Sequence, residues 1–92
     1  PAMIALMEQT AMQAVEACLD EGEGTVGTEV NVRHLKATPV GRTITCTATL
    51  QEVNGNRLLF HVEADDENGR IGEGRHERFI IDNRKFIEKL SR

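Results

Sequence analysis

The sequence predicts an α+β domain in which one long apolar helix is wrapped by an antiparallel sheet. The first observation is a segment at 2–19 that is rich in apolar helix formers. The second is a set of four later segments in which apolar and polar residues alternate, as in half-buried strands. The third is a pair of Asn-Gly dipeptides between these segments, which signal turns between antiparallel strands. A single apolar helix needs a sheet to cover it, so we expect the helix on one sheet face.

The helix is expected over residues 2–19, because Ala, Leu, Met, Glu and Gln dominate there and glycines follow at 22 and 24. Polar residues at helical spacing form one stripe, made of Gln9, Gln13, Glu16 and Asp20. Nearly all other positions are apolar, so we expect the helix to be mostly enclosed. Glu8 lies outside the stripe, among apolar neighbours on the helix surface.

Glu8 is the most informative local feature of this helix. Burying an ionised carboxylate is costly unless it is paired or hydrogen-bonded. A carboxylate on an apolar face suits general acid or base catalysis. The alternative interpretation is a structural carboxylate, bonded to the backbone or to an arginine at an interface between subunits.

Four strands are expected at 25–34, 43–53, 57–64 and 70–81. Alternation in the first strand predicts one shared face for Val26, Thr28, Val30, Val32 and His34. The second and third strands are expected to turn inward Ile44, Cys46, Ala48, Leu50, Leu58, Phe60, Val62 and Ala64. Four strands leave two sheet edges, and an edge is a place where a second copy can pair.

The segments between the strands carry turn signals. Asn54-Gly55 and Asn68-Gly69 predict hairpins, and Pro39-Val40-Gly41 predicts the turn before the second strand. Residues 83–90 are expected to form a short terminal helix.

Composition excludes several classes of protein. Eleven basic against fifteen acidic residues give the 92-residue chain a net charge of −4, which argues against phosphate-driven nucleic-acid binding. No apolar stretch approaches the length of a membrane span. Cys18 and Cys46 lack metal-ligand spacing, so we expect no metal site and two buried free thiols in a reducing compartment. A domain this small buries only about 60% of its unfolded surface, so we expect an oligomer.

The last strand combines glycines with charged residues. His76 and Arg78 share the alternation of Gly72 and Gly74, and glycines beside polar residues in a strand mark a bulge or a close backbone approach. The pattern alone favours an ordinary surface cation at Arg78. His34 ends the first strand, where the pattern favours an exposed histidine over one that shares a core edge with Glu8.

A small cluster of cations follows the first strand. Arg33, Lys36 and Arg42 favour a solvated charged face, with contact to a phosphorylated ligand as the alternative.

Four motifs carry a resemblance, which extends from Pro1 to about Lys89. They are L-M-E in the helix, G-E-G-x-x-G-T before the first strand, V-x-H-x-x-A-T-P-x-G after it, and G-x-G-x-H-E-R in the last strand. Together they resemble the hotdog-fold acyl-CoA thioesterases, and in particular the fluoroacetyl-CoA thioesterase group and its uncharacterised relatives.

The resemblance implies one hotdog domain over 1–92 that hydrolyses a short-chain acyl-CoA to free acid and CoA. It implies no cofactor beyond the coenzyme A of the substrate, a homodimer and a cytoplasmic location. It assigns catalytic roles to Glu8 and His34. It further implies that Gly27 lines the acyl pocket and that Arg78 lies on the coenzyme A side of the site.

The resemblance also implies groups that this sequence does not contain. The catalytic threonine of the family falls immediately before Pro1, and a first strand and a lid segment lie further upstream. We therefore expect an N-terminally incomplete domain. The missing threonine favours the alternative of a non-catalytic module that binds acyl-CoA or a small acid. A third interpretation is a structural dimerisation domain in which Glu8 pairs across the interface.

Overall fold

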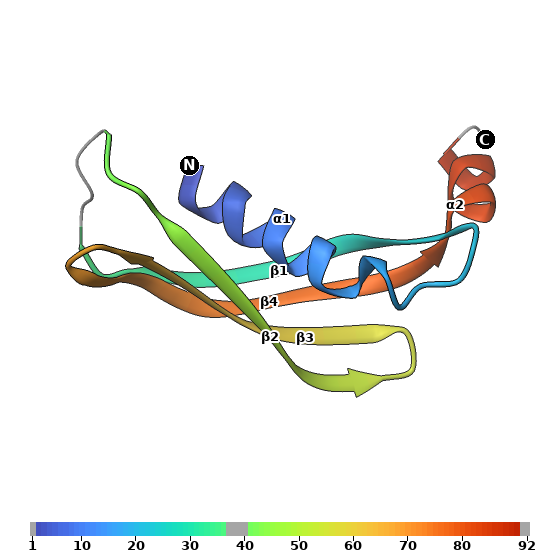
Figure 1. The fold of residues 1–92 in the computed structure, drawn as a ribbon. Coiled ribbons are helices and arrows are strands. Elements are labelled where there is room, and N and C mark those ends of the chain that lie inside the picture. The colour runs from blue at the N-terminus through green and yellow to red at the C-terminus, as the bar shows by residue number, and fades with distance from the viewer. Residues whose placement is uncertain (1, 37–40, 91–92) are drawn as a thin grey trace.

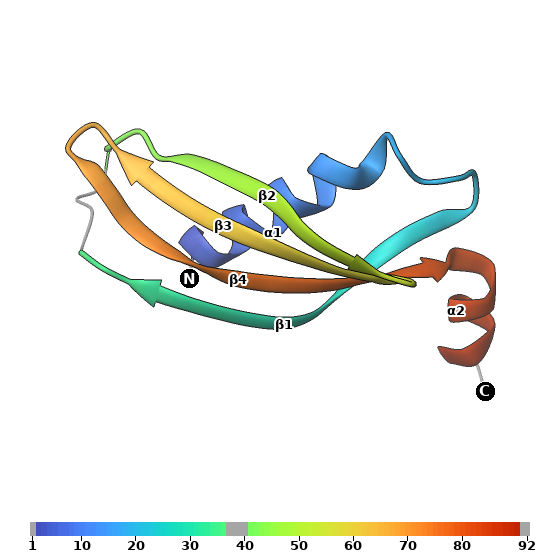
Figure 2. The same cartoon turned by 90° about the horizontal axis from the view of Figure 1, so that it is seen from below.

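The computed structural model describes residues 2–36 and 41–90, which form a helix packed on one face of a four-stranded antiparallel sheet (Figure 1). The elements are α1 (Ala2–Glu16), β1 (Glu23–His34), β2 (Thr45–Asn54), β3 (Arg57–Asp66), β4 (Gly69–Asp82) and α2 (Asn83–Leu90). The strands lie in the order β1-β4-β3-β2, so β1 and β2 form the edges of the sheet (Figure 2). The predicted α+β class is confirmed.

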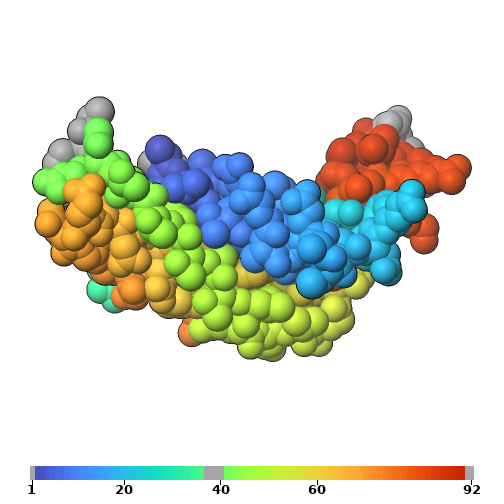
Figure 3. All heavy atoms as spheres, in the orientation of Figure 1, coloured from blue at the N-terminus to red at the C-terminus, as the bar shows by residue number. Residues whose placement is uncertain are grey.

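Helix α1 buries a single stripe of side chains against the sheet, formed by Met3, Met7, Ala11 and Val15. The predicted polar stripe is exposed, as expected. The expectation of a mostly enclosed helix is wrong, because the described sheet covers one side of α1 and leaves the other at the surface (Figure 3). The helix also ends at Glu16 rather than residue 19, since the N–H groups of Cys18 and Leu19 bond to carbonyls three residues back, as in a tighter turn.

The core is aliphatic apart from one aromatic ring. Leu58, Phe60, Val62 and Ala64 of β3 are all buried beneath α1, which confirms the predicted alternation of this strand. Cys46 and Ala48 of β2 pack against them, also as predicted. Leu50 lies opposite the buried Phe60 and so faces inward as predicted, but it is 43% exposed because it lines a hollow between α1 and the sheet.

A β-bulge interrupts β1 at Thr28. Gly27 pairs with Arg78 and Glu29 with Glu77, so Thr28 is an extra residue on β1. Residues before the bulge therefore have the opposite alternation to residues after it. The prediction that Val26 and Thr28 share a face with Val30 is wrong for this reason, and Thr25 and Gly27 take their place on the helix side.

Two glycines let other parts of the chain approach β4 closely. A Cβ at Gly72 would lie 2.6 Å from Sδ of Met3 in α1. A Cβ at Gly74 would overlap the Asn31 carbonyl of β1. The predicted close backbone approach is confirmed, and it seats the first turn of α1 on β4.

The predicted hairpins are confirmed, with positive φ angles at Gly55 and Gly69. Most of the predicted Pro39-Val40-Gly41 turn lies outside the described residues. The terminal helix α2 projects from the end of β4, and Asp82 caps it by accepting a hydrogen bond from the Lys85 N–H. Neither described helix is long and apolar enough to cross a lipid bilayer.

The cysteines depart from the prediction of two buried thiols. Both are free, but Cys18 is exposed and lies just beyond the end of α1. Cys46 is half-buried, and its burial, together with the negative charge of Asp65, raises the pKa of its thiol.

Candidate functional site

Three of the residues singled out in the sequence converge beneath the middle of α1. Gly27 of β1 lies opposite Arg78 of β4, and the Glu8 side chain extends toward Gly27 from the helix. A Cβ at Gly27 would lie 3.3 Å from Nη1 of Arg78 and 3.4 Å from Oε2 of Glu8. The same Cβ would lie 3.0 Å from Cε1 of His76. The missing side chain at Gly27 therefore leaves a small space bounded by a carboxylate, a guanidinium and an imidazole.

Arg78 is buried, with 7% of its surface exposed, so the pattern-based preference for a surface cation is wrong. The bulge in β1 explains the error, because it turns Thr25 toward Arg78 and supplies polar partners inside. Nε of Arg78 donates to Oγ1 of Thr25 (2.8 Å), and Nη2 donates to the Thr25 carbonyl (2.9 Å). Burial lowers the pKa of the Arg78 guanidinium, and the negative charge of Glu8 opposes that shift.

His76 lies one inward position from Arg78 along β4 and is 1% exposed. Its Nδ1 is 2.9 Å from the Glu29 carbonyl, and its Nε2 is 3.1 Å from Nη1 of Arg78. The sequence assigned no role to His76 or Thr25. For His76 the shared alternation with Arg78 was the available signal, whereas the bulge concealed the position of Thr25.

Glu8 is half-buried on α1. Its carboxylate forms no hydrogen bond or ion pair with another side chain in the described parts of the chain. Buried polar groups are normally satisfied, so a carboxylate left open beside a buried cation has lone pairs available for an incoming group. This arrangement can accept a proton or a hydrogen bond from a small molecule placed over Gly27.

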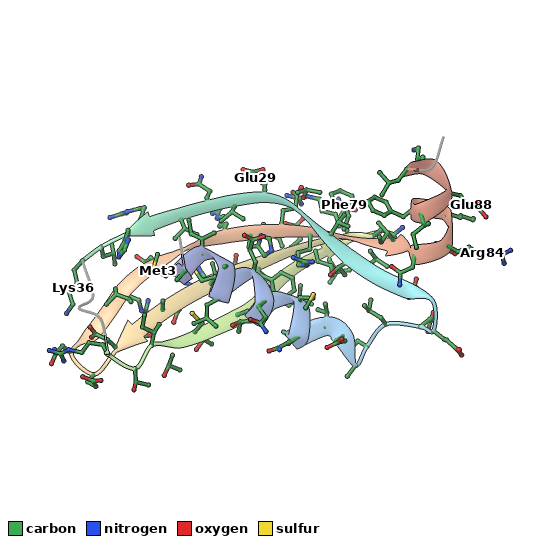
Figure 4. The ribbon with its side chains drawn as sticks, turned by 90° about the horizontal axis from the view of Figure 1, so that it is seen from above. Met3, Glu29, Lys36, Phe79, Arg84 and Glu88 are labelled. Carbon is green, nitrogen blue, oxygen red and sulfur yellow. The ribbon has the colours of Figure 1, made fainter. Side chains whose placement is uncertain are left out.

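His34 is not part of this cluster. It is exposed at the end of β1, in the same row of the sheet as Gly72, against which Met3 packs. Figure 4 shows the same end of the molecule, with Met3 of α1 and Lys36 just beyond β1. The stretch of β1 between Gly27 and His34 is roughly 20 Å long. Within one chain the structure therefore does not bring His34 to Glu8, and both catalytic assignments stay predictions.

The predicted cation cluster is dispersed. Arg33 and Lys36 are exposed, while Arg42 forms an ion pair of 2.7 Å with Glu67. Within residues 2–36 and 41–90, no group of three His, Cys, Asp or Glu side chains could hold a metal ion.

A separate apolar hollow of about 480 Å³ lies between the C-terminal half of α1 and the sheet. Its walls include Val15, Cys18, Leu50 and Phe60. None of the predicted site residues lines it, so the polar cluster and this hollow are distinct features of the inner face.

Comparison with known proteins gives a consistent result. Residues 1–84 match the family described as FlK, fluoroacetyl-CoA-specific thioesterase. The fluoroacetyl-CoA thioesterase of Streptantibioticus cattleyicolor is 44% identical over 88 residues, which cover 96% of this chain and 63% of that protein. This chain therefore spans less than two thirds of that relative.

Solved structures agree in fold. The fluoroacetyl-CoA thioesterase FlK superposes with a TM-score of 0.92 at 44% identity, over 97% of this chain and 66% of that one. A hot-dog-like protein from Thermanaerovibrio acidaminovorans gives a TM-score of 0.92 at 29% identity, with the same coverage of 97% and 66%. The expected hotdog fold and the resemblance drawn from the sequence motifs are both confirmed. The chain belongs to the FlK family of fluoroacetyl-CoA-specific thioesterases.

Proposed function

We propose that this chain hydrolyses the thioester of a short-chain acyl-CoA to the free acid and CoA. The observation that carries the proposal is the open Glu8 carboxylate beside the buried Arg78 guanidinium, over the space at Gly27. Membership of the FlK family supports the same reaction. No cofactor is required, because coenzyme A is part of the substrate.

In the proposed reaction, Glu8 accepts a proton from the attacking water as the water oxygen bonds to the thioester carbonyl carbon. The carbon–sulfur bond then breaks, and the departing CoA thiolate takes the proton from Glu8. Arg78 uses three of its nitrogens in the bonds to Thr25 and His76, and each of the two terminal nitrogens keeps one further N–H. The N–H on Nη1 lies next to the space at Gly27, where its charge stabilises a developing oxyanion.

The acyl group is proposed to be short, because the space above Gly27 exists only through the missing side chain. A single methyl at this position would already approach three polar side chains within 3.4 Å. A small acyl group fits this description better than a long one, which would need the separate apolar hollow.

A homodimer is proposed because a second subunit would bring a His34 close to Glu8, which the His34 of the same chain does not reach. In the described sheet β1 is an edge strand with one unpaired side. Antiparallel pairing of two β1 strands about a two-fold axis at Asn31 would bring His34 of the partner subunit opposite Gly27, because Thr28 is an extra residue in this pairing too. His34 would then act as proton carrier or general acid for the Glu8 of the other chain. The free cysteines fit the reducing cytoplasm, which we propose as the location.

The proposed activity is tested by thiol release from acetyl-, fluoroacetyl-, propionyl- and butyryl-CoA. We expect turnover by the wild type and a fall in kcat of about 100-fold or more in Glu8→Gln, with acyl-CoA binding preserved. Glu16→Gln, on the exposed face of the same helix, is the matched control and should keep its kcat. Binding of acyl-CoA without turnover in the wild type would overturn hydrolysis in favour of a binding module. A change confined to oligomeric state or Tm in Glu8→Gln would favour a structural carboxylate.

The shared site is tested by mixing two inactive variants. Chains that carry Glu8→Gln and chains that carry His34→Ala are unfolded together, refolded and assayed. If each site takes Glu8 from one chain and His34 from the other, mixed dimers hold one intact site and activity returns. If both residues act within one chain, every site stays defective and the mixture is as inactive as its components.

A further inference from the structure

His76 takes no direct part in the reaction proposed above, although it contacts Arg78, which does. We propose that His76 is a positioning residue, which holds Arg78 so that Nη1 faces the space above Gly27 where Glu8 ends. As a statement about catalysis, this inference rests on the proposed thioesterase function. As a statement about Arg78, it can be tested without any turnover.

The contacts of the His76 ring fix its tautomer. A backbone carbonyl can only accept a hydrogen bond, so Nδ1 must carry the proton that it shares with the Glu29 oxygen (2.9 Å). A guanidinium can only donate, so Nε2 must be the acceptor for Nη1 of Arg78 (3.1 Å). Both requirements are met by the neutral ring with its proton on Nδ1. The Glu29 carbonyl therefore determines that His76 presents its unprotonated Nε2 to Arg78.

The three bonds of Arg78 hold different parts of its guanidinium. Thr25 takes Nε and Nη2, which lie on one side of the group. His76 takes Nη1, the nitrogen that lies 3.3 Å from the Cβ position of Gly27. Without His76, the nitrogen nearest the site would lose its hydrogen-bond acceptor among the described residues. Its direction would then depend on Thr25 alone.

The alternative is that His76 merely fills space in the core. Its ring is 1% exposed and packs in the row that also holds Phe60. A buried imidazole is costly unless both nitrogens are satisfied, and an apolar side chain would fill the same volume without that requirement. The two interpretations differ in one respect: only the positioning role depends on the acceptor at Nε2.

Two amide variants separate these interpretations. Asparagine places its amide near the position of Nδ1, so His76→Asn keeps a donor for the Glu29 carbonyl and loses the acceptor for Arg78. Glutamine reaches the position of Nε2, so His76→Gln keeps an acceptor for Arg78. Each variant retains one of the two hydrogen bonds, which makes them matched in polarity. His61→Asn and His61→Gln serve as controls, because His61 faces away from the site and pairs with Glu63 (2.9 Å).

The kinetic expectation follows from the geometry. His76→Gln should keep kcat within about threefold of the wild type, whereas His76→Asn should lose about 10- to 100-fold in kcat with a smaller change in KM. A space-filling role predicts that both variants lose kcat alike, in step with any loss of Tm. Equal kcat in the two variants at similar Tm would overturn the proposal.

A second readout does not need the reaction. The wild type and His76→Gln should show separate NMR signals for the Nη1 and Nη2 protons of Arg78, because a held guanidinium rotates slowly. His76→Asn should merge these signals. If turnover is absent but this contrast is seen, the proposed function fails and the positioning of Arg78 stands.

The tautomer of His76 can be measured directly in the wild type, without any substitution. Nitrogen-15 shifts of His76 should report a protonated Nδ1 and an unprotonated Nε2. A proton on Nε2 in the wild type would overturn the proposal, even if both His76 variants failed to fold.

Discussion

The two faces of β4 carry similar charged and polar residues, which are buried on one face and largely exposed on the other. On the face under α1, His76 and Arg78 are buried and meet fixed polar atoms of β1. On the other face, Arg75 is exposed and Glu77 joins an open network with Thr28 and Arg57. Figure 4 shows the neighbouring Glu29 pointing to this outer side, away from α1.

The charged side chain on the inner face belongs to the candidate site, whereas the charged side chains on the outer face form ion pairs at the surface. A second outer cluster shows the pattern clearly: Arg70 contacts Glu63, Asp65 and Glu73, all partly exposed. Exposed ion pairs of this kind contribute about 0–1 kcal/mol each, because water competes for both partners. Removing a buried side chain that satisfies other buried polar groups costs about 1–3 kcal/mol for each group left without a partner. Substitutions on the inner face of β4 should therefore lower the free energy of unfolding more than substitutions on its outer face.

The largest effect is expected from Arg78→Met. The change removes three hydrogen bonds and leaves both oxygens of Thr25 and Nε2 of His76 without a partner. We expect a loss of about 3 kcal/mol or more in the free energy of unfolding, measured from urea midpoints. Arg75→Met, the matched change on the outer face, should cost less than about 0.5 kcal/mol. Equal losses in the two variants would break the comparison between the faces.

An intermediate effect is expected from Gly27→Ala. The new Cβ would lie 3.0 Å from Cε1 of His76, so the imidazole and the guanidinium must both give way. We expect kcat/KM for acetyl-CoA to fall about 10- to 100-fold while the protein stays folded. Gly24→Ala is the control in the same strand, since its Cβ meets the mobile end of the Asn83 side chain. Unchanged kinetics in Gly27→Ala would mean that the acyl group does not occupy this space.

The smallest effect is expected on the outer face and depends on pH. Hydrogen bonds from Thr28 and Arg57 lower the pKa of Glu77 below its ordinary 4.5. A carboxyl whose pKa is lowered by folding stabilises the fold above its ordinary pKa, and that contribution is lost as the pH falls through the lowered value. The Tm difference between wild type and Glu77→Gln should therefore be largest near neutral pH and shrink below pH 4.5. A difference that grows in acid would contradict this assignment.

Much of the fold was readable from local patterns. The alternation of β3 and the Asn-Gly turns are local properties of the chain, and the structure confirms both. Glu8 also stood out locally, as a carboxylate among apolar neighbours. The polar stripe of α1 shows the same success, since helical spacing alone separates exposed from buried positions.

The rest depended on pairing between distant segments. The bulge at Thr28 has no signature in β1 itself, because it is defined by the register with β4. Missing it reversed the expected faces of Val26 and Gly27 and removed Thr25 from consideration. Arg78 was then assigned to the surface, since nothing in the sequence showed that β1 would supply its partners. The end of α1 was also misplaced, because good helix formers continue to Leu19 beyond the last turn that packs on the sheet.

The bulge has a consequence for how this protein tolerates change in length. The extra residue lets β1 run in two phases, so that Gly27 and Val30, three positions apart, both face the helix. Deleting Thr28 would remove the bulge but keep Gly27 opposite Arg78 and Glu29 opposite Glu77, so Thr25 and Gly27 would still face the helix in a regular strand. A loss of one residue at this point would therefore leave the pairing of β1 and β4 and the site around Arg78 intact, at the cost of the hydrogen bond from Thr28 to Glu77 on the outer face.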